Sequence, residues 1–337
     1  MTWPFPGRIK KSPKGGNKMN AFNFLIQQMM IFSIPLLIVA LSAMFSERSG
    51  VINIAVEGMM VMGAFAGTLY LHFASMNPNF APQKALFMAI LLAILIGILS
   101  GAFLAFASVN MFADQTIAGT AINMFAAAFS IFIARSLVGI QQISFSGAYQ
   151  IDKVPILGDL PILGPFFFQN AYITTYLGLI ILGISTFVLY KTSFGLRLRS
   201  AGEYPQATDA AGISVSKIRW AGVLISGALA GLGGLAYILP VSTEFNGAVN
   251  GYGFLAIAVL IFGQWKPKYI VGAAFFFGLL KTISAAYTGI PFLYGLGIPK
   301  FIYDSLPYAI TIVALYVTSK HSHAPASEGI PFDKGSR

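Results

Sequence analysis

The sequence contains no cysteine and few charged residues. None of the 337 residues is Cys, and only 9% are Asp, Glu, Lys or Arg. The missing thiols exclude disulfides, thiolate metal sites and cysteine nucleophiles. Soluble domains carry about 25% charged residues, so a chain this poor in charge could not cover a water-exposed surface. The composition therefore excludes a soluble enzyme.

Residue patterns that support catalysis or metal binding are also missing. The three histidines, His72, His321 and His323, form no His-Glu-x-x-His pattern. No Gly-x-x-x-x-Gly-Lys-Ser/Thr segment is present to hold nucleotide phosphates, and no paired carboxylates accompany a nucleophile. We therefore expect no catalytic residue, no metal site and no cofactor. Energy for any transport must come from a gradient or from a separate subunit.

Apolar residues dominate the chain. Hydrophobic residues make up 56% of it, with 30 Phe and a mean hydropathy of +0.75. Because a helix needs about 20 apolar residues to cross the hydrocarbon core, the runs predict an all-α polytopic bundle of about 8–10 spanning helices. The predicted helices cover residues 23–45, 58–76, 85–108, 115–136, 171–190, 219–240, 252–265, 269–288 and 303–319.

Basic residues between the apolar runs predict the orientation, because short cytoplasmic loops are enriched in Lys and Arg. We expect residues 1–18 to form a basic cytoplasmic tail, 191–219 a cytoplasmic loop and 321–337 a cytoplasmic C-terminal tail. The transmembrane domain then covers 19–320, with 137–170 as an external loop. The net charge of +10 is spread over these loops, so it does not indicate nucleic-acid binding.

The first half of this topology does not close. Four apolar runs lie between a cytoplasmic tail and an external loop, where an odd number is needed. One run must therefore be broken or re-entrant. The polar stretch Glu47–Glu57 is the leading candidate, since irregular backbone at membrane depth occurs only inside protein or beside a cavity.

Glycines four residues apart occur three times within the predicted helices. Such spacing lets helices approach closely. We favour packing within the chain over an oligomer interface. The pairs are Gly63/Gly67, Gly97/Gly101 and Gly227/Gly231.

The loop Lys191–Trp220 is too long for a simple turn. Pro205 can open a helix over Gln206–Ala211, and Gly212 can end it. A short helix in a basic frame suits docking to a soluble partner. A solvated connector explains the same pattern, and the residues alone leave the two interpretations even.

Several further segments accompany this loop. The loop resembles the coupling segment of ABC-importer permeases, in the branch for branched-chain amino acids, simple sugars and nucleosides. Among these the chain looks closest to nucleoside or simple-sugar permeases. The segments that share the resemblance are Phe45–Gly67, Ala113–Phe125, Gly251–Gly263 and Ile330–Arg337.

The resemblance implies a permease subunit of an ATP-driven importer in the bacterial cell (inner) membrane, taking up nucleosides. It implies two ABC ATPase subunits, an extracellular substrate-binding lipoprotein, and a second permease, either a related chain or a second copy. It also implies that the chain itself is not an enzyme. The residues that it places in the ATPase-coupling helix and its cap are Gly202, Glu203, Pro205, Ala207, Ala211, Gly212 and Ile213.

Polar residues within the apolar runs are candidates for the substrate pathway, since a charge there is costly without a function. Asn53 and Glu57 would share a helix face, and they either line the pathway or hold a broken helix together; we favour the second role. Asn123 lies near Asp114, which we expect to cap the following helix. Lys281 either faces a cavity or a carboxylate, or extends its ammonium group to the interface.

Other transport classes remain open at this stage. A simple-sugar or branched-chain amino-acid permease of the same branch shares these motifs. A gradient-driven carrier would need no ATPase, and a membrane-embedded enzyme would need the acid–base groups that the sequence lacks.

Overall fold

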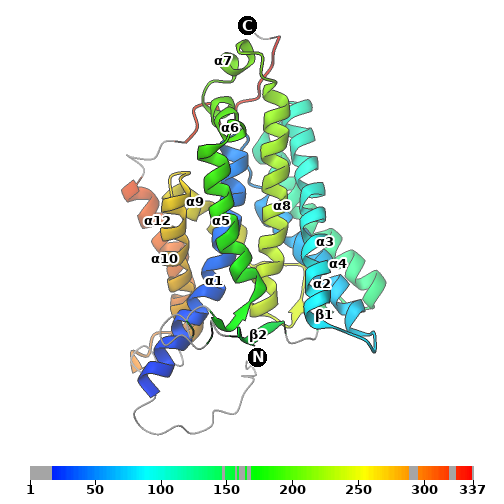
Figure 1. Cartoon of the computed structure of the whole chain (residues 1–337), viewed down its shortest axis with the longest axis vertical. Helices are drawn as coiled ribbons and strands as arrows, with labels where there is room; N and C mark the ends of the chain where they lie inside the picture. Colours follow the sequence, from blue (N-terminus) through cyan, green and yellow to red (C-terminus); the bar gives the residue numbers. More distant parts are fainter. Residues whose placement is uncertain are drawn as a thin grey trace.

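The computed structural model describes residues 17–145, 149–155, 158, 164, 168–287, 295–318 and 324–335. These residues form a bundle of long helices, with two short helices at its upper end in Figure 1 and small strands at its lower end. The helices are α1 (Asn17–Glu47), α2 (Val56–Ser75), α3 (Pro82–Ala105), the π-helical turn η1 (Phe106–Asn110), α4 (Gln115–Val138), α5 (Ile173–Lys191), α6 (Ser193–Glu203), α7 (Pro205–Ala210), α8 (Val215–Val241), α9 (Tyr252–Phe262), α10 (Pro267–Ala286) and α12 (Lys300–Thr318).

Each apolar run of the sequence corresponds to one of these helices. Six described segments are long and apolar enough to cross a membrane by length and composition: α1, α3 with η1, α4, α5, α8 and α10. Helices α2, α9 and α12 match the other three predicted runs. The prediction of an all-α, polytopic transmembrane bundle is confirmed.

Local chemistry sets the helix boundaries. The Asp114 carboxylate accepts hydrogen bonds from the backbone N–H groups of Thr116 and Ile117, both at 2.9 Å, and so caps α4 as the sequence predicted. Gly139 adopts a left-handed φ of 85° and ends the same helix. Asp114 and Gly139 therefore mark the two ends of α4.

Helices α1 and α8 form the centre of the bundle. Within their most apolar windows 89% of α1 and 78% of α8 is buried, against 22% of α4. Helix α1 packs against α8, α9 and α10, and α8 packs against α2 and α3. Because all sides of α1 meet protein, its apolar residues fill the core, whereas α4 exposes large apolar side chains such as Phe132.

The glycine pairs lie where α2, α3 and α8 cross. A Cβ at Gly227 would be pressed against the carbonyl oxygen of Gly97, and one at Gly63 against the backbone of Gly231. Gly101 approaches Gly227 and Val223 in the same way. The prediction that these pairs pack helices within the chain is confirmed.

The two described ends of the chain lie at opposite ends of the bundle. Helix α1 begins at the lower end, and segment 324–335 lies at the upper end beside α6 and α7 (Figure 1). The prediction that both termini share one face is therefore wrong for the start of α1; residues 1–16 lie outside the described residues. The orientation of a membrane protein depends on the basic residues in all of its short loops. The residues that flank the first helix usually, though not always, dominate that orientation.

This arrangement also resolves the mismatch in the first half of the chain. If α1 starts at the lower end, the four helices α1 to α4 can all cross the membrane. The irregular backbone predicted at 47–57 is present: residues 48–55 are non-helical, and Ser49, Val51, Asn53 and Ala55 are buried. The chain does not turn back there, so of the two predicted alternatives, a broken or a re-entrant run, the structure has the broken one. The segment instead leads from the end of α1 into α2.

A second interruption lies in the other half of the chain. Helix α9 has 11 residues, which at about 1.5 Å per residue gives about 16 Å, roughly half the hydrocarbon thickness. Glu47 contacts Trp265 just beyond its end, and Glu57 contacts Gly253 at its start. The unwound stretch 48–55 therefore runs alongside the short helix, within the bundle.

Small strands cover the lower end. Strand β1 (Ile143–Ser144) pairs with β4 (Glu244–Phe245), and β2 (Gln150–Lys153) pairs with β3 (Gln169–Tyr172), both antiparallel. Parts of the predicted external loop, 137–170, lie outside the described residues. The pairing ties the segment after α4 to the segment that connects α8 with α9.

Candidate functional site

The short helices α6 and α7 form the segment that the sequence singled out for coupling. The Thr192 hydroxyl accepts from the Gly195 N–H at 3.1 Å and starts α6. Pro205 is the first residue of α7, and Gly212 has a left-handed φ of 78° just beyond its end. The helix predicted over Gln206–Ala211 is therefore present one residue earlier.

The bundle holds this segment firmly. Gly202 lies so close to the carbonyl oxygen of Arg48 that no side chain fits between them. The Arg48 guanidinium lies 3.6 Å from the Glu203 carboxylate, and the Ser200 and Thr208 hydroxyls are 2.6 Å apart. Gly202 and Glu203 therefore serve as attachment points between the segment and the end of α1.

The outer side of α7 is free of contacts with the bundle. Tyr204 is 70% exposed, and Gln206, Ala207, Ala211 and Gly212 are exposed as well. These residues lie at the upper extremity of the molecule (Figure 1), while Pro205 is buried beneath them and Ile213 is half-buried. A short helix presented this way on a fixed base can transmit a push from a partner into α8 and α1.

A groove of about 340 Å³ lies next to this outer side. On one side of it, the Lys334 ammonium group lies 3.2 Å from the Asp209 carboxylate. The groove gives a partner a concave surface beside the exposed helix. It is lined by Phe112, Asp209, Gly212, Ile213, Ser214, Val215, Ser216, Phe332, Asp333 and Lys334.

Basic residues concentrate at this end of the bundle. Their excess over the lower end predicts that the α6–α7 end faces the cytoplasm. At the lower end, Lys18, Lys84, Arg135, Lys153 and Lys300 lie near helix ends or in a strand. The upper set comprises Arg48, Lys191, Arg197, Arg199, Lys217, Arg219, Lys266, Lys268 and Lys334.

The Glu57 carboxylate binds the start of the short helix α9. Its two carboxylate oxygens accept hydrogen bonds from the backbone N–H groups of Gly251 at 2.8 Å and Gly253 at 2.6 Å. The N-terminus of a helix carries unpaired N–H groups and a positive dipole, so a carboxylate satisfies both. This geometry fits the role of holding a broken helix together rather than a free charge in a pathway.

Asn53 and Asn123 bind the unwound stretch on either side. Asn53 is non-helical, which means that it does not share a helix face with Glu57, and its Nδ2 donates to the Ser226 hydroxyl at 2.8 Å. Asn123 donates from Nδ2 to the Ile54 carbonyl at 2.9 Å and accepts from the Gly58 N–H at 2.7 Å. Both amides therefore satisfy backbone or hydroxyl groups at depth.

We expect Glu57→Ala to destabilise the protein more than Glu57→Gln. Alanine leaves two N–H groups at the start of α9 without acceptors, at about 1–3 kcal/mol for each, whereas glutamine keeps one acceptor. Thermal unfolding of the detergent-purified chain measures the order. Glu244→Ala is the matched control, since Glu244 is exposed at the lower end. Equal melting temperatures for Glu57→Ala and wild type would contradict this role.

Lys281 lies on α10 with its ammonium group 5.0 Å from the centre of the Tyr308 ring on α12. Asp304 on α12 accepts from the Ser284 hydroxyl at 2.6 Å and lies 4.0 Å from Lys300, so neither contact involves Lys281. The Tyr308 hydroxyl in turn donates to the Asn250 carbonyl at 3.4 Å, one residue before the Gly251 N–H that binds Glu57. The roles of the four candidate residues in a substrate pathway stay predictions.

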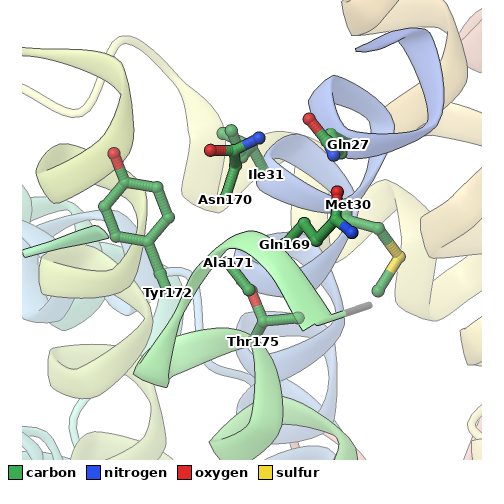
Figure 2. Close-up of a pocket in the computed structure, with 8 residues that line it drawn as sticks. All are labelled: Gln27, Met30, Ile31, Gln169, Asn170, Ala171, Tyr172 and Thr175. Atoms are coloured by element: carbon green, nitrogen blue, oxygen red, sulfur yellow. The ribbon is translucent and has the colours of Figure 1, made fainter. Parts of the chain in front are cut away.

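A small pocket lies where α1 meets β3 and the start of α5 at the lower end. Its volume of about 10 Å³ holds one water molecule at most, so it cannot be a substrate site. Figure 2 shows Gln27 and Met30 of α1 opposite Gln169 of β3, with the Tyr172 ring pointing away from Gln27.

One polar cluster was missed by the sequence analysis. The Trp265 indole N–H donates to Glu47 at 2.6 Å, and the Arg48 guanidinium donates to the Trp265 carbonyl. Arg219, which is 2% exposed, lies beside Gly50. Residues 47 and 48 were predicted to lie in an irregular stretch and residue 219 in a cytoplasmic loop, but no pattern in the sequence indicated that these residues come together.

Comparison with known proteins identifies the same architecture. A family described as branched-chain amino acid transport system / permease component matches residues 25–315. The chain is similar to the guanosine ABC transporter permease protein NupQ of Bacillus subtilis (strain 168), 38% identical over 94% of this chain and 98% of NupQ. It is 35% identical to the nucleoside ABC transporter permease protein NupC of Lactococcus lactis subsp. cremoris (strain MG1363), over 94% and 99% of the two chains.

Two further similarities bear on assembly and fold. The same two organisms each have a second permease, for guanosine or nucleosides, that also matches, at 28% and 27% identity. A solved structure, an inward-facing conformation of a putative metal-chelate type ABC transporter, covers 92% of each chain with a TM-score of 0.51 and 17% identity, which shows a common fold. This chain is a multi-pass membrane protein and belongs to the family of branched-chain amino acid transport system permease components.

Proposed function

We propose that this chain is a membrane-spanning subunit of an ATP-driven importer and that the substrates are nucleosides. The observation that carries the substrate class is the near full-length similarity to NupQ and NupC, at 38% and 35% identity. The exposed side of α7 supports the dependence on ATP, because it offers a fixed, protruding helix for a cytoplasmic ATPase. Two ATPase subunits hydrolyse the ATP, and the chain itself contributes movement.

The complete transporter contains two permease subunits. In each of two organisms this chain matches two different permease proteins, which supports a related second chain as its partner rather than a second copy. An extracellular substrate-binding lipoprotein delivers the nucleoside at the lower end. ATPase closure then moves α6–α7, and the packed helices α1 and α8 carry that motion to the pathway.

Uptake competition in proteoliposomes tests this function. The full complex, reconstituted with ATP inside the vesicles, is expected to accumulate labelled guanosine and adenosine against a gradient. Unlabelled nucleosides should compete, whereas pentoses and leucine should not. Inhibition by leucine or by a sugar would instead indicate another substrate class of this family.

Purification of the tagged chain tests the energy source. An ATPase subunit is expected to co-purify with it. Uphill accumulation by the isolated chain in response to an ion gradient would contradict the proposal and indicate a secondary carrier.

A further inference from the structure

The segment 324–334 folds back onto α6. The Ser327 N–H donates to the Gly202 carbonyl at 2.8 Å, and the Ser327 hydroxyl donates to the Glu203 carbonyl at 3.2 Å. The Ala326 N–H donates to the Glu203 carboxylate, also at 3.2 Å. The segment is therefore hydrogen-bonded to the very end of α6, where the coupling segment bends into α7.

The same segment is bonded to the bundle on its other side. The Gly329 N–H donates to the Gly50 carbonyl at 3.2 Å, and the Arg219 Nη1 donates to the Ile330 carbonyl at 2.8 Å. Arg219 is 2% exposed, and its Nε and Nη2 have no hydrogen-bond partner among the described residues. Loss of the segment would remove an acceptor from a buried cation, which is costly, so the docked position is favoured.

A pair of carboxyl groups lies beneath the segment. The Glu328 carboxyl lies close enough to that of Glu47, at the end of α1, for the two groups to interact. Two carboxylates repel each other unless one proton lies between them. The charged groups packed around this pair are Arg48 from the turn after α1, Glu203 from α6 and Arg219 from α8.

We propose that residues 324–334, here called the C-terminal clasp, position the coupling segment by joining the end of α6 to the ends of α1 and α8. This inference rests on the proposed function of α6–α7 as the ATPase-docking segment. Glu328 is its central positioning residue. With the clasp docked, a push on α7 reaches α1 and α8 directly. With the clasp released, α6 keeps its packing against α5, α8 and Arg48 but loses these hydrogen bonds, and part of the push is lost.

Docking of the clasp depends on pH. Burial raises the pKa of Glu328 from its ordinary value of 4.5 to about 7. The docked state therefore binds a proton more tightly than the released state. Docking is strongest below the ordinary value, weakens as pH rises from about 4.5 to about 7, and does not change further above that.

The experiment compares Glu328→Ala and Glu328→Gln in the reconstituted full complex, with substrate taken up per ATP hydrolysed as the readout. The glutamine amide can hydrogen-bond to Glu47 without titrating, whereas alanine cannot. Glu328→Ala is expected to raise the released fraction about fivefold, the change that loss of about 1 kcal/mol produces, and to lower uptake per ATP. Glu328→Gln is expected to restore wild-type coupling.

The pH profile separates positioning from a general loss of structure. Wild-type coupling is expected to fall between about pH 5 and about pH 7, while Glu328→Gln should lose the part of this fall that the Glu328 carboxyl causes. Glu244→Ala is the matched control, because the Glu244 carboxyl is exposed at the lower end. The pH profile of this variant should match that of wild type. Unchanged coupling in Glu328→Ala, or an unchanged pH profile in Glu328→Gln, would overturn the inference.

Amide exchange in residues 200–204 of the isolated chain in nanodiscs gives a readout that needs no ATPase. Faster exchange there in Glu328→Ala, with rescue in Glu328→Gln, supports the clasp even if no ATPase binds the chain. Exchange equal to wild type in Glu328→Ala counts against it. ATP-independent transport by the wild-type complex would contradict the proposed function alone, so the two failures are distinguishable.

Discussion

Gly227→Leu is expected to abolish folding of the transmembrane bundle. A Cβ at Gly227 would be pressed against the backbone of Gly97 and would lie 3.0 Å from the Cα of Gly101. Backbone atoms of a buried helix cannot move aside as a flexible side chain can, so α3 and α8 would have to separate. Overpacking at more forgiving sites costs about 1–3 kcal/mol, and we expect the upper end of that range or more here.

The fraction of monodisperse protein after detergent extraction measures this effect, with the melting temperature of whatever remains. Gly183→Leu on α5 and Gly272→Leu on α10 are matched controls, because nothing lies within 4 Å of a Cβ at either position. Both controls should extract as wild type does. Normal extraction of Gly227→Leu would show that α3 and α8 are not held at backbone contact.

The helices were predictable from the sequence because the chain is so poor in charge. A run of about 20 uncharged residues has few alternatives to a spanning helix, and Pro205, Gly212 and Asp114 mark helix ends by local chemistry alone. The glycine pairs at four-residue spacing likewise predicted close packing, although not which helices meet.

The side of the membrane on which the chain begins was not predictable in the same way. The basic residues before Asn17 favoured a cytoplasmic start, but the basic loops of the rest of the chain compete with them. The outcome depends on their sum and on how many helices cross. The short helix α9 was predictable: the sequence analysis placed a helix at 252–265, and α9 covers Tyr252–Phe262, so only its end lies three residues earlier.

Only part of the candidate site could be predicted from the sequence, because its polar contacts join residues far apart in the chain. Glu57 suggested a structural role from its depth, but its partners Gly251 and Gly253 follow nearly 200 residues later. Glu47 and Glu328 are separated by almost the whole chain. Only the packing of α1 against α8 and α9 brings such residues together, and periodicity within one helix carries no information about it.

Ala207→Arg is expected to block ATPase docking while leaving the fold intact. Ala207 is exposed on α7, so a longer side chain extends into solvent and meets nothing in the isolated chain. In the complex it would occupy the space of the partner, and a fixed helix seated in a groove cannot shift to admit it. We expect ATPase affinity and ATP-driven uptake to fall at least tenfold, which corresponds to about 1.4 kcal/mol.

Co-purification of the ATPase with the tagged permease, together with uptake by the reconstituted complex, measures this effect. Ser193→Arg is the matched control. Ser193 is exposed at the opposite end of α6, and the substitution adds the same charge to the same basic face. The control should bind the ATPase as wild type does. If Ala207→Arg also binds it normally and transports normally, the partner docks elsewhere, and the exposed side of α7 is only a solvated connector between α6 and α8.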